Sequence, residues 1–423
     1  SEMCIRDRLK IRVSTDGRFL QFKNHKDNQM TLDWLMGIAG FLLIVSIFAN
    51  RISDRFGIPG LLLFLGIGML AGTDGVGKIQ FSNARLSNYI GTVALTFILF
   101  SGGLETKWNE VKPVVMRGSV LSTAGVFLTA FFLFVCAYYL IGLSFEVALL
   151  LSVIVSSTDA PAVFAIMRTS GMHLKTGLKP ILEFESGSND PMAVLLSMGA
   201  ITILTADSYS AAVMLSDFVL QMAIGLGLGL AVGFGVGRFL QKWCLVYQGL
   251  YPVFGVGVVL VTFSLTQLLH GNGFLAVYLC GIVLGNTPFM YRRHLIRFQD
   301  SLAWIMQIGM FLILGLLVNP HEFNGIMLVS FACSLALMFV ARPAAVFICL
   351  FKSGYTLNEK LFISWAGLKG AVPIILATYP LMERFPNSQF LFNLIFFLVI
   401  ISVLFQGKTL APLARRLKLE DRN

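Results

Sequence analysis

The sequence contains few charged residues for its length. Asp, Glu, Lys and Arg make up 13% of the 423 residues, whereas a soluble domain carries about 25%. This deficit excludes an ordinary soluble enzyme, a disordered chain and a nucleic-acid-binding protein. Apolar runs separated by short polar turns instead fill the chain from Trp34 to Leu413. The sequence therefore predicts an all-α polytopic membrane protein.

Other absences narrow the function. The chain has no HExxH zinc motif, no GxGxxG or P-loop nucleotide motif and no TVGYG potassium filter. Its six cysteines show no paired spacing, so we expect packed thiols rather than disulfides or metal ligands. No nucleophile and base stand at a sensible spacing either. We therefore expect no enzymatic activity, no cofactor and no nucleic-acid partner.

Hydrophobic runs and basic residues together predict the topology. The thirteen hydrophobic segments comprise residues 34–50, 58–72, 88–102, 114–141, 146–168, 180–205, 214–240, 251–269, 273–286, 301–318, 325–351, 360–381 and 390–412. One set of alternate loops, counted with the adjoining ends of the segments and the C-terminal tail, holds twenty Lys or Arg, and the other set holds three. Because cytoplasmic loops carry the basic excess, we expect an inner (cell) membrane protein with its N-terminus outside and its C-terminus cytoplasmic.

The two ends of the chain differ from its apolar middle. Residues 1–29 are polar and hold seven Lys or Arg without an apolar run. We expect them to be a non-native or disordered N-terminal extension. The expected domains are then a transmembrane domain over residues 30–413 and the start of a cytoplasmic tail over residues 414–423.

Two hydrophobic segments are interrupted in mid-span. In Ser156–Pro161 the proline disfavours a continuous helix, so freed carbonyls, the Thr158 hydroxyl and the Asp159 carboxylate are candidates to meet a cation. The alternative is a structural kink capped by Asp159. In Gly367–Pro373 a proline and two glycines break the twelfth segment, and Lys369 is expected to neutralise the C-terminal end of a half-helix. Breaks in segments 5 and 12 suggest inverted repeats of about six helices, an arrangement found around transporter sites.

The sixth segment carries the most informative motif, which runs from Glu185 to Pro191. Ser186, Asn189 and Asp190 share one helix face because they lie three or four residues apart. Their oxygens suit a hard cation, and burial disfavours the charged form of a carboxylate. A buried Asp190 can therefore hold either a proton or a cation, and this competition is sufficient for an exchanger. The alternative is a helix start with a capping serine.

The arginine in the eleventh segment, Arg342, needs a counter-charge within the membrane. We predict a structural ion pair with Glu185, which leaves Asp190 unpaired. The competing possibility pairs Arg342 with Asp190, which keeps that carboxylate ionised and prevents proton exchange.

At these residues the chain resembles the monovalent cation/proton antiporters of the NhaP type, most closely their potassium/proton branch. The resemblance covers residues 30–413. It is carried by Thr158-Asp159, by Glu185-Ser186-x-x-Asn189-Asp190 and by Arg342, with longer similar stretches at Gly249–Pro252, Leu275–Asn286 and Gly309–Pro320. Lys369 departs from the family's usual arginine, so the charge is kept and the planar fork is lost. The branch also has a cytosolic regulatory region, which we expect to be missing or truncated here.

The resemblance implies a fold, an assembly and a site. The fold is the NhaA/NhaP-like one, with about 13 transmembrane helices and crossed broken helices 5 and 12, in a homodimer that works by an elevator-like movement. The implied cation/proton site comprises Asp190, Asn189, Ser186, Thr158 and Asp159, with the monovalent cation (a metal ion) at Asp190, Ser186 and Thr158.

The leading hypothesis is a secondary antiporter that exchanges a monovalent cation for H+ across the lipid bilayer and serves pH homeostasis. The resemblance favours K+ and puts Na+ next, and the ligand types alone do not choose between them because both ions take the same oxygens. One acid that binds either one cation or one proton predicts electroneutral exchange. A cation channel is the alternative from another class, but a channel would keep conducting with Asp190 neutralised.

Overall fold

The computed structural model describes residues 33–34, 36–48, 60–79, 81, 83–172, 174, 177–205, 211–318 and 325–420. Regular structure in these ranges is helical, apart from one isolated antiparallel bridge between Leu174 and Glu420. The all-α prediction is therefore confirmed for them. Residues 1–29, the predicted extension, lie outside the described ranges. An apolar helix covers Met36–Phe48, and the fold described below is that of the residues from Gly60 on.

A first group of helices packs around α3 and α12. Its members are α2 (Gly60–Ala71), α3 (Ala84–Glu105), α10 (Ala211–Lys242), α11 (Leu250–Leu268), α12 (Gly273–Asn286) and α13 (Arg292–Leu316). α12 lies against both α3 and α10, and α13 lies against α2 and α3. The backbones of α3 and α12 come into contact because Gly103 and Gly281 face each other. A Cβ on Gly281 would lie 2.6 Å from the Phe100 carbonyl oxygen, so small residues allow this close packing.

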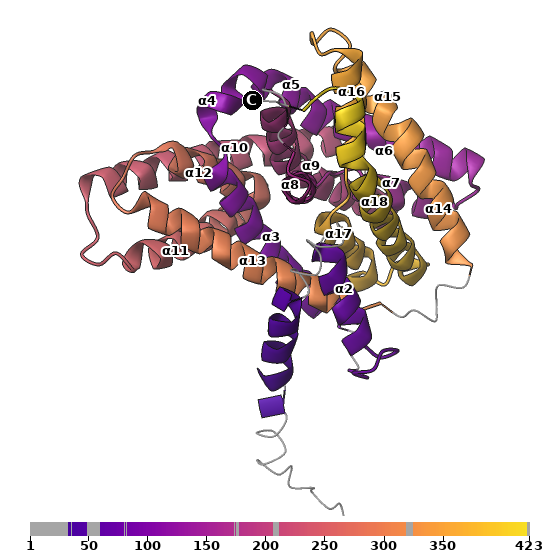
Figure 1. Ribbon diagram of the computed structural model, residues 1–423, viewed down its shortest axis with the longest axis horizontal. Helices are drawn as coiled ribbons and strands as arrows, with labels where there is room; N and C mark the ends of the chain where they lie inside the picture. The colour runs from indigo at the N-terminus through magenta and orange to yellow at the C-terminus, as the bar shows by residue number, and fades with distance from the viewer. Residues whose placement is uncertain are drawn as a thin grey trace, which may run out of the picture. The chain divides into compact units, whose positions relative to one another are not determined.

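A second group contains the broken helices. Its members are α4 (Trp108–Val111), α5 (Val115–Val120), α6 (Val126–Val135), α7 (Phe145–Ile154), α8 (Ala160–Thr169), α9 (Leu178–Thr205), α14 (Ile326–Ala336), α15 (Arg342–Cys349), α16 (Leu357–Trp365), α17 (Ala371–Met382) and α18 (Ser388–Arg416). Figure 1 shows α10, α11 and α12 on the left and α14, α15 and α18 on the right. The groups meet mainly where α3 packs on α17 and α12 packs on α9.

The predicted hydrophobic segments coincide with these helices, although some ends differ. Seven helices in the described ranges are long and apolar enough to cross a membrane, and the count of about thirteen spans stays a prediction. α4, α5 and α6 form one continuous span, Trp108–Leu140, joined by short 3-10 and π-helical turns. α13 begins at Arg292, nine residues before the predicted segment 301–318. Its first turns are polar, and apolar content alone therefore missed them.

Both predicted helix breaks are present. The fifth segment is divided between α7, which ends at Ile154, and α8, which begins at Ala160. The twelfth is divided between α16, which ends at Trp365, and α17, which begins at Ala371. The two breaks touch, because the Asp159 amide donates a hydrogen bond to the Leu368 carbonyl oxygen at 2.8 Å. The two predicted breaks therefore lie against each other in the fold.

Candidate functional site

The break between α7 and α8 is shaped by Asp159 and Pro161. Asp159 has an extended backbone and is the N-cap of α8, where its carboxylate accepts a hydrogen bond from the Ala162 amide at 3.0 Å. Pro161 occupies the first turn of α8, where a missing amide hydrogen leaves no intrahelical bond unmade. Asp159 thus caps α8, as in the structural alternative of the sequence analysis, and an unwound stretch between α7 and α8 is present as well.

Lys369 links this break to the second one. Its side chain is 1% exposed, and its ammonium nitrogen donates to the Ser157 carbonyl oxygen at 2.7 Å and to the Ser156 carbonyl oxygen at 3.5 Å. These carbonyls follow the last turn of α7, where unsatisfied backbone oxygens concentrate negative charge. Lys369 therefore lies where the sequence analysis expects a charge that compensates a half-helix end.

The polar face of α9 contacts the unwound stretch of α7–α8. The Ser186 hydroxyl donates to the Thr158 carbonyl oxygen at 2.9 Å and accepts from the Ala160 amide at 3.0 Å. The Asn189 side-chain amide donates to the Thr158 hydroxyl at 2.6 Å. Three of the predicted site residues are therefore joined directly, and these bonds satisfy backbone groups that the break has freed.

Asp190 lies beside this network without belonging to it. It is 8% exposed, and its Oδ1 has no hydrogen-bond partner in the described ranges. Ser157, Asp159 and Lys369 are close enough to interact with it. The side-chain oxygen Oδ1 of Asn189 likewise has no partner there. A buried carboxylate oxygen and a buried amide oxygen without partners are groups that a cation or a proton can satisfy.

Arg342 is paired with Glu185. The Nη1 of Arg342 lies 2.6 Å from Oε1 of Glu185, and the two side chains are 2% and 1% exposed. No ion pair joins Arg342 to Asp190 among the residues that the structure describes. The guanidinium also lies against Gly367, where a Cβ would come 2.7 Å from Nε. The structure thus places Arg342 beside Glu185, one of the two acids that the sequence analysis considers as its partner.

Comparison with known proteins assigns the chain to the same kind of protein as the motifs in its sequence. The family model described as "Sodium/hydrogen exchanger, transmembrane" matches residues 40–416. The chain belongs to this family of membrane transporters. It is 41% identical over 389 residues to the K(+)/H(+) antiporter NhaP of Alkalimonas amylolytica, and the match covers 90% of this chain and 67% of that protein.

Two further matches agree with this membership. The chain is 40% identical over 392 residues to the K(+)/H(+) antiporter NhaP2 of Shewanella sp. strain MR-4, with the same shares covered. The solved structure of the sodium proton antiporter MjNhaP1 from Methanocaldococcus jannaschii matches with a TM-score of 0.80 at 21% identity, over 91% of this chain and 99% of that one. The exchanger fold of the chain is thereby established.

Tyr278 of α12 and Asn272, the N-cap residue of that helix, were not in the sequence-based site, and both lie against α9 near Asp190. The Tyr278 ring fills the space beside Gly187, and a Cβ on Gly187 would overlap that ring. Tyr278 is 2% exposed, and its hydroxyl is close enough to Thr106 to interact with it. The Asn272 side-chain amide donates to the Pro191 carbonyl oxygen at 3.0 Å. α12 therefore covers α9 from the first helix group, a contact that residue spacing does not reveal.

The sequence analysis also missed a polar pair of residues in α18. Ser402 and Gln406 are 0% and 2% exposed, and they are bonded to each other and to the backbone of the second break. Their spacing of four residues, directly after the apolar run of residues 394–401, is the signal that marks them in the sequence.

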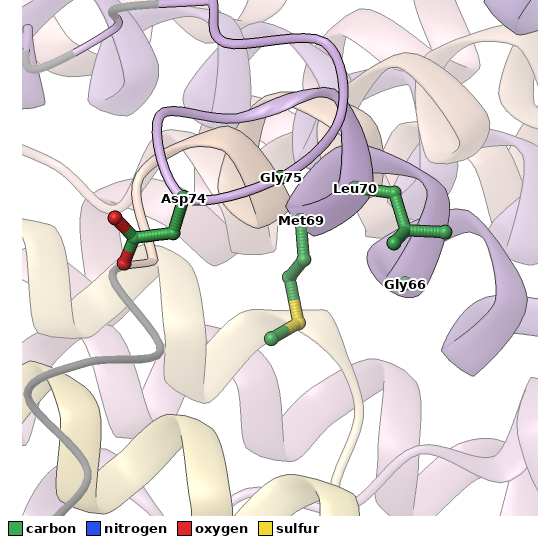
Figure 2. A pocket seen from close by; sticks show the side chains of 5 residues that line it. All are labelled: Gly66, Met69, Leu70, Asp74 and Gly75. Atoms are coloured by element: carbon green, nitrogen blue, oxygen red, sulfur yellow. The ribbon is translucent and has the colours of Figure 1, made fainter.

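A surface cavity of about 350 Å³ lies elsewhere on the molecule, at the end of α2. It is lined by Gly66, Met69, Leu70, Asp74 and Gly75, as Figure 2 shows. None of the predicted site residues lines it, so it plays no part in the site.

Proposed function

We propose that the chain is a secondary antiporter that exchanges a monovalent cation for H+ by alternating access, with Asp190 as the group that binds one or the other. The observation that carries this proposal is the buried Asp190 carboxylate, which has an unpartnered oxygen beside two crossed broken helices. Membership of the exchanger family supports it. A transporter of this kind uses ion gradients, and we assign no catalytic residue and no cofactor.

K+ is the proposed cation, with Na+ as the alternative. Two relatives at 40–41% identity are K(+)/H(+) antiporters, which supports K+. The family description and the matched MjNhaP1 structure refer to sodium, which keeps Na+ in consideration. Oxygen ligands accept both ions, so the donor set does not choose between them.

The proposed site combines free and engaged oxygens. Asp190 and Asn189 each contribute a buried side-chain oxygen without a partner. The hydroxyls of Ser186 and Thr158 already take part in hydrogen bonds between α9 and the unwound stretch. A cation that bound these hydroxyl oxygens would therefore bind oxygens that are also hydrogen-bonded. Asp159 is bonded through its capping role to the Ala162 amide and contributes mainly negative charge.

The charges at the site support electroneutral exchange. The ionisable side chains at the two breaks and the ion pair are Arg342, Lys369, Glu185, Asp159 and Asp190. With every group ionised their net charge is −1, so one monovalent cation or one proton neutralises the site. Because either ligand gives the same net charge, we propose that a full cycle moves no charge across the membrane.

We further propose the orientation and the assembly. The excess of basic residues in one set of loops supports an inner (cell) membrane location with the N-terminus outside and the C-terminus cytoplasmic. The proposed transmembrane domain is residues 30–413, with residues 1–29 as an N-terminal extension and residues 414–423 as the start of a cytoplasmic tail. The division into two helix groups supports a movement of the second group against the first, and the resemblance to the NhaP-type antiporters supports the proposal of a homodimer.

Purified protein in liposomes with a pH-sensitive dye inside tests the proposal. We expect K+, and more weakly Na+, to drive proton movement that Asp190→Asn abolishes while the variant still folds. Asp217→Asn is a matched acid-to-amide control in α10 and should exchange like the wild type. Cation flux without proton coupling that survives in Asp190→Asn would instead identify a channel.

A further inference from the structure

Ser402 and Gln406 form a buried polar pair in the middle of α18, directly behind the second helix break. The eight residues before Ser402 and the three residues between the pair are apolar, and neither side chain belongs to the proposed cation site. Leucine at these positions would pack well inside an apolar bundle, whereas a buried hydroxyl and a buried amide need hydrogen-bond partners. The partners they have therefore show what the pair holds in place.

The pair connects both ends of the unwound stretch between α16 and α17. Gln406 donates from Nε2 to the carbonyl oxygen of Trp365, the last residue of α16, at 3.0 Å. The Ser402 hydroxyl donates to Oε1 of Gln406 at 2.5 Å and accepts from the Lys369 amide at 3.2 Å. These bonds satisfy two backbone groups that the break removes from helical pairing.

The same bonds fix the starting point of the Lys369 side chain. The amide that Ser402 accepts from belongs to Lys369, whose ammonium nitrogen lies 2.7 Å from the Ser157 carbonyl oxygen in the opposite break. Lys369 is also close enough to Asp190 for the two charges to interact. A backbone shift at Lys369 would withdraw the ammonium from the carbonyls of α7 and leave its positive charge free to approach Asp190.

We propose that Ser402 and Gln406 are positioning residues for cation exchange. They hold the Lys369 backbone so that the ammonium stays on the α7 carbonyls and does not compete with the cation for Asp190. This inference rests on the proposed function, because it assigns to α18 a role in the cation affinity of that same site.

Two variants and a matched control test the role in liposomes. Ser402→Ala removes the hydroxyl that accepts from the Lys369 amide, and Gln406→Leu removes the whole amide at similar size. Thr409→Val is the control, because Thr409 lies on the same helix and accepts from the Trp365 indole nitrogen at 2.9 Å without contacting the Lys369 backbone. The measured quantities are the KM for K+, the maximal exchange rate and the thermal stability.

We expect both variants to raise the KM for K+ by about tenfold, the factor that one buried hydrogen bond represents, with the maximal rate within about twofold. Ser402→Thr keeps the hydroxyl and should restore the wild-type KM, and Thr409→Val should leave KM unchanged. If Gln406→Leu does not fold, Ser402→Ala decides the question, since it removes one atom and leaves the helix intact.

The opposite result is equally clear. An unchanged KM in Ser402→Ala, or an equal rise in Thr409→Val, would show that the pair only stabilises the bundle and would overturn the inference. Wild-type protein that fails to exchange K+ or Na+ for protons would refute the proposed function itself. The two failures are therefore distinguishable in one set of liposome measurements.

Discussion

Removal of Arg342 should destabilise the protein far more than removal of an exposed partner. Arg342→Ala leaves the Glu185 carboxylate, which is 1% exposed, without the guanidinium at 2.6 Å. A buried charge that loses its partner costs about 3–5 kcal/mol, out of a typical total stability of about 5–15 kcal/mol. We therefore expect a large fall in both the yield and the thermal stability of this variant.

Lys179 and Glu183 provide a matched comparison on α9. Their side chains are 57% and 28% exposed, and the two charged atoms are 3.4 Å apart. A partly exposed pair of this kind contributes about 0–1 kcal/mol. Lys179→Ala should therefore cost at most about a third of what Arg342→Ala costs, although each substitution removes one basic partner of a glutamate in the same helix.

The assay is the fraction of protein that remains folded after heating, measured by size-exclusion chromatography. The double variant Glu185→Gln with Arg342→Met removes both charges and should recover most of the lost stability, because a pair replaced by neutral groups is often tolerated. If Arg342→Ala matched Lys179→Ala, or if the double variant were no more stable than the single one, the argument from the buried ion pair would be refuted.

Three further predictions concern the site. Gly187→Ala places a Cβ in the Tyr278 ring, and it should slow exchange and lower the stability of the protein by about 1–3 kcal/mol. Gly227→Ala is the control, because its Cβ would meet no atom within 4 Å, and it should change neither the heating assay nor the liposome assay. Equal behaviour of the two variants would contradict the packing argument. Gly370→Ala places a Cβ in the Asp159 carboxylate and should abolish K+-driven proton movement, and an active variant would show that this approach is dispensable. Exchange should proceed at the same rate in liposomes with and without an imposed membrane potential, and a rate that follows the potential would exclude electroneutral exchange.

Hydrophobic runs and prolines determined much of the fold in advance. Apolar segments predict helices because only a chain with internally satisfied backbone bonds is stable in hydrocarbon, and the helices lie where these runs are. The breaks at Thr158 and Lys369 follow from a nearby proline, a purely local effect of ring geometry. Glu185 and Arg342 were recognisable because a charge in an apolar run requires a partner.

Local sequence fails where a residue's role depends on which helices lie side by side. In the sequence, Tyr278 is an aromatic residue in an apolar helix, and its contact with α9 becomes visible only when α12 packs on that helix. In the same way, the role of the Ser402 hydroxyl becomes visible only when α18 packs against the second break. The first turns of α13, residues 292–300, were missed because they are polar and the segments were predicted from runs of apolar residues. The sequence by itself determined the helices, their breaks and the buried charges, since these depend on neighbours in the chain. Only the tertiary structure decided which side chains meet across helices, because long-range packing depends on the shapes of all the helices together.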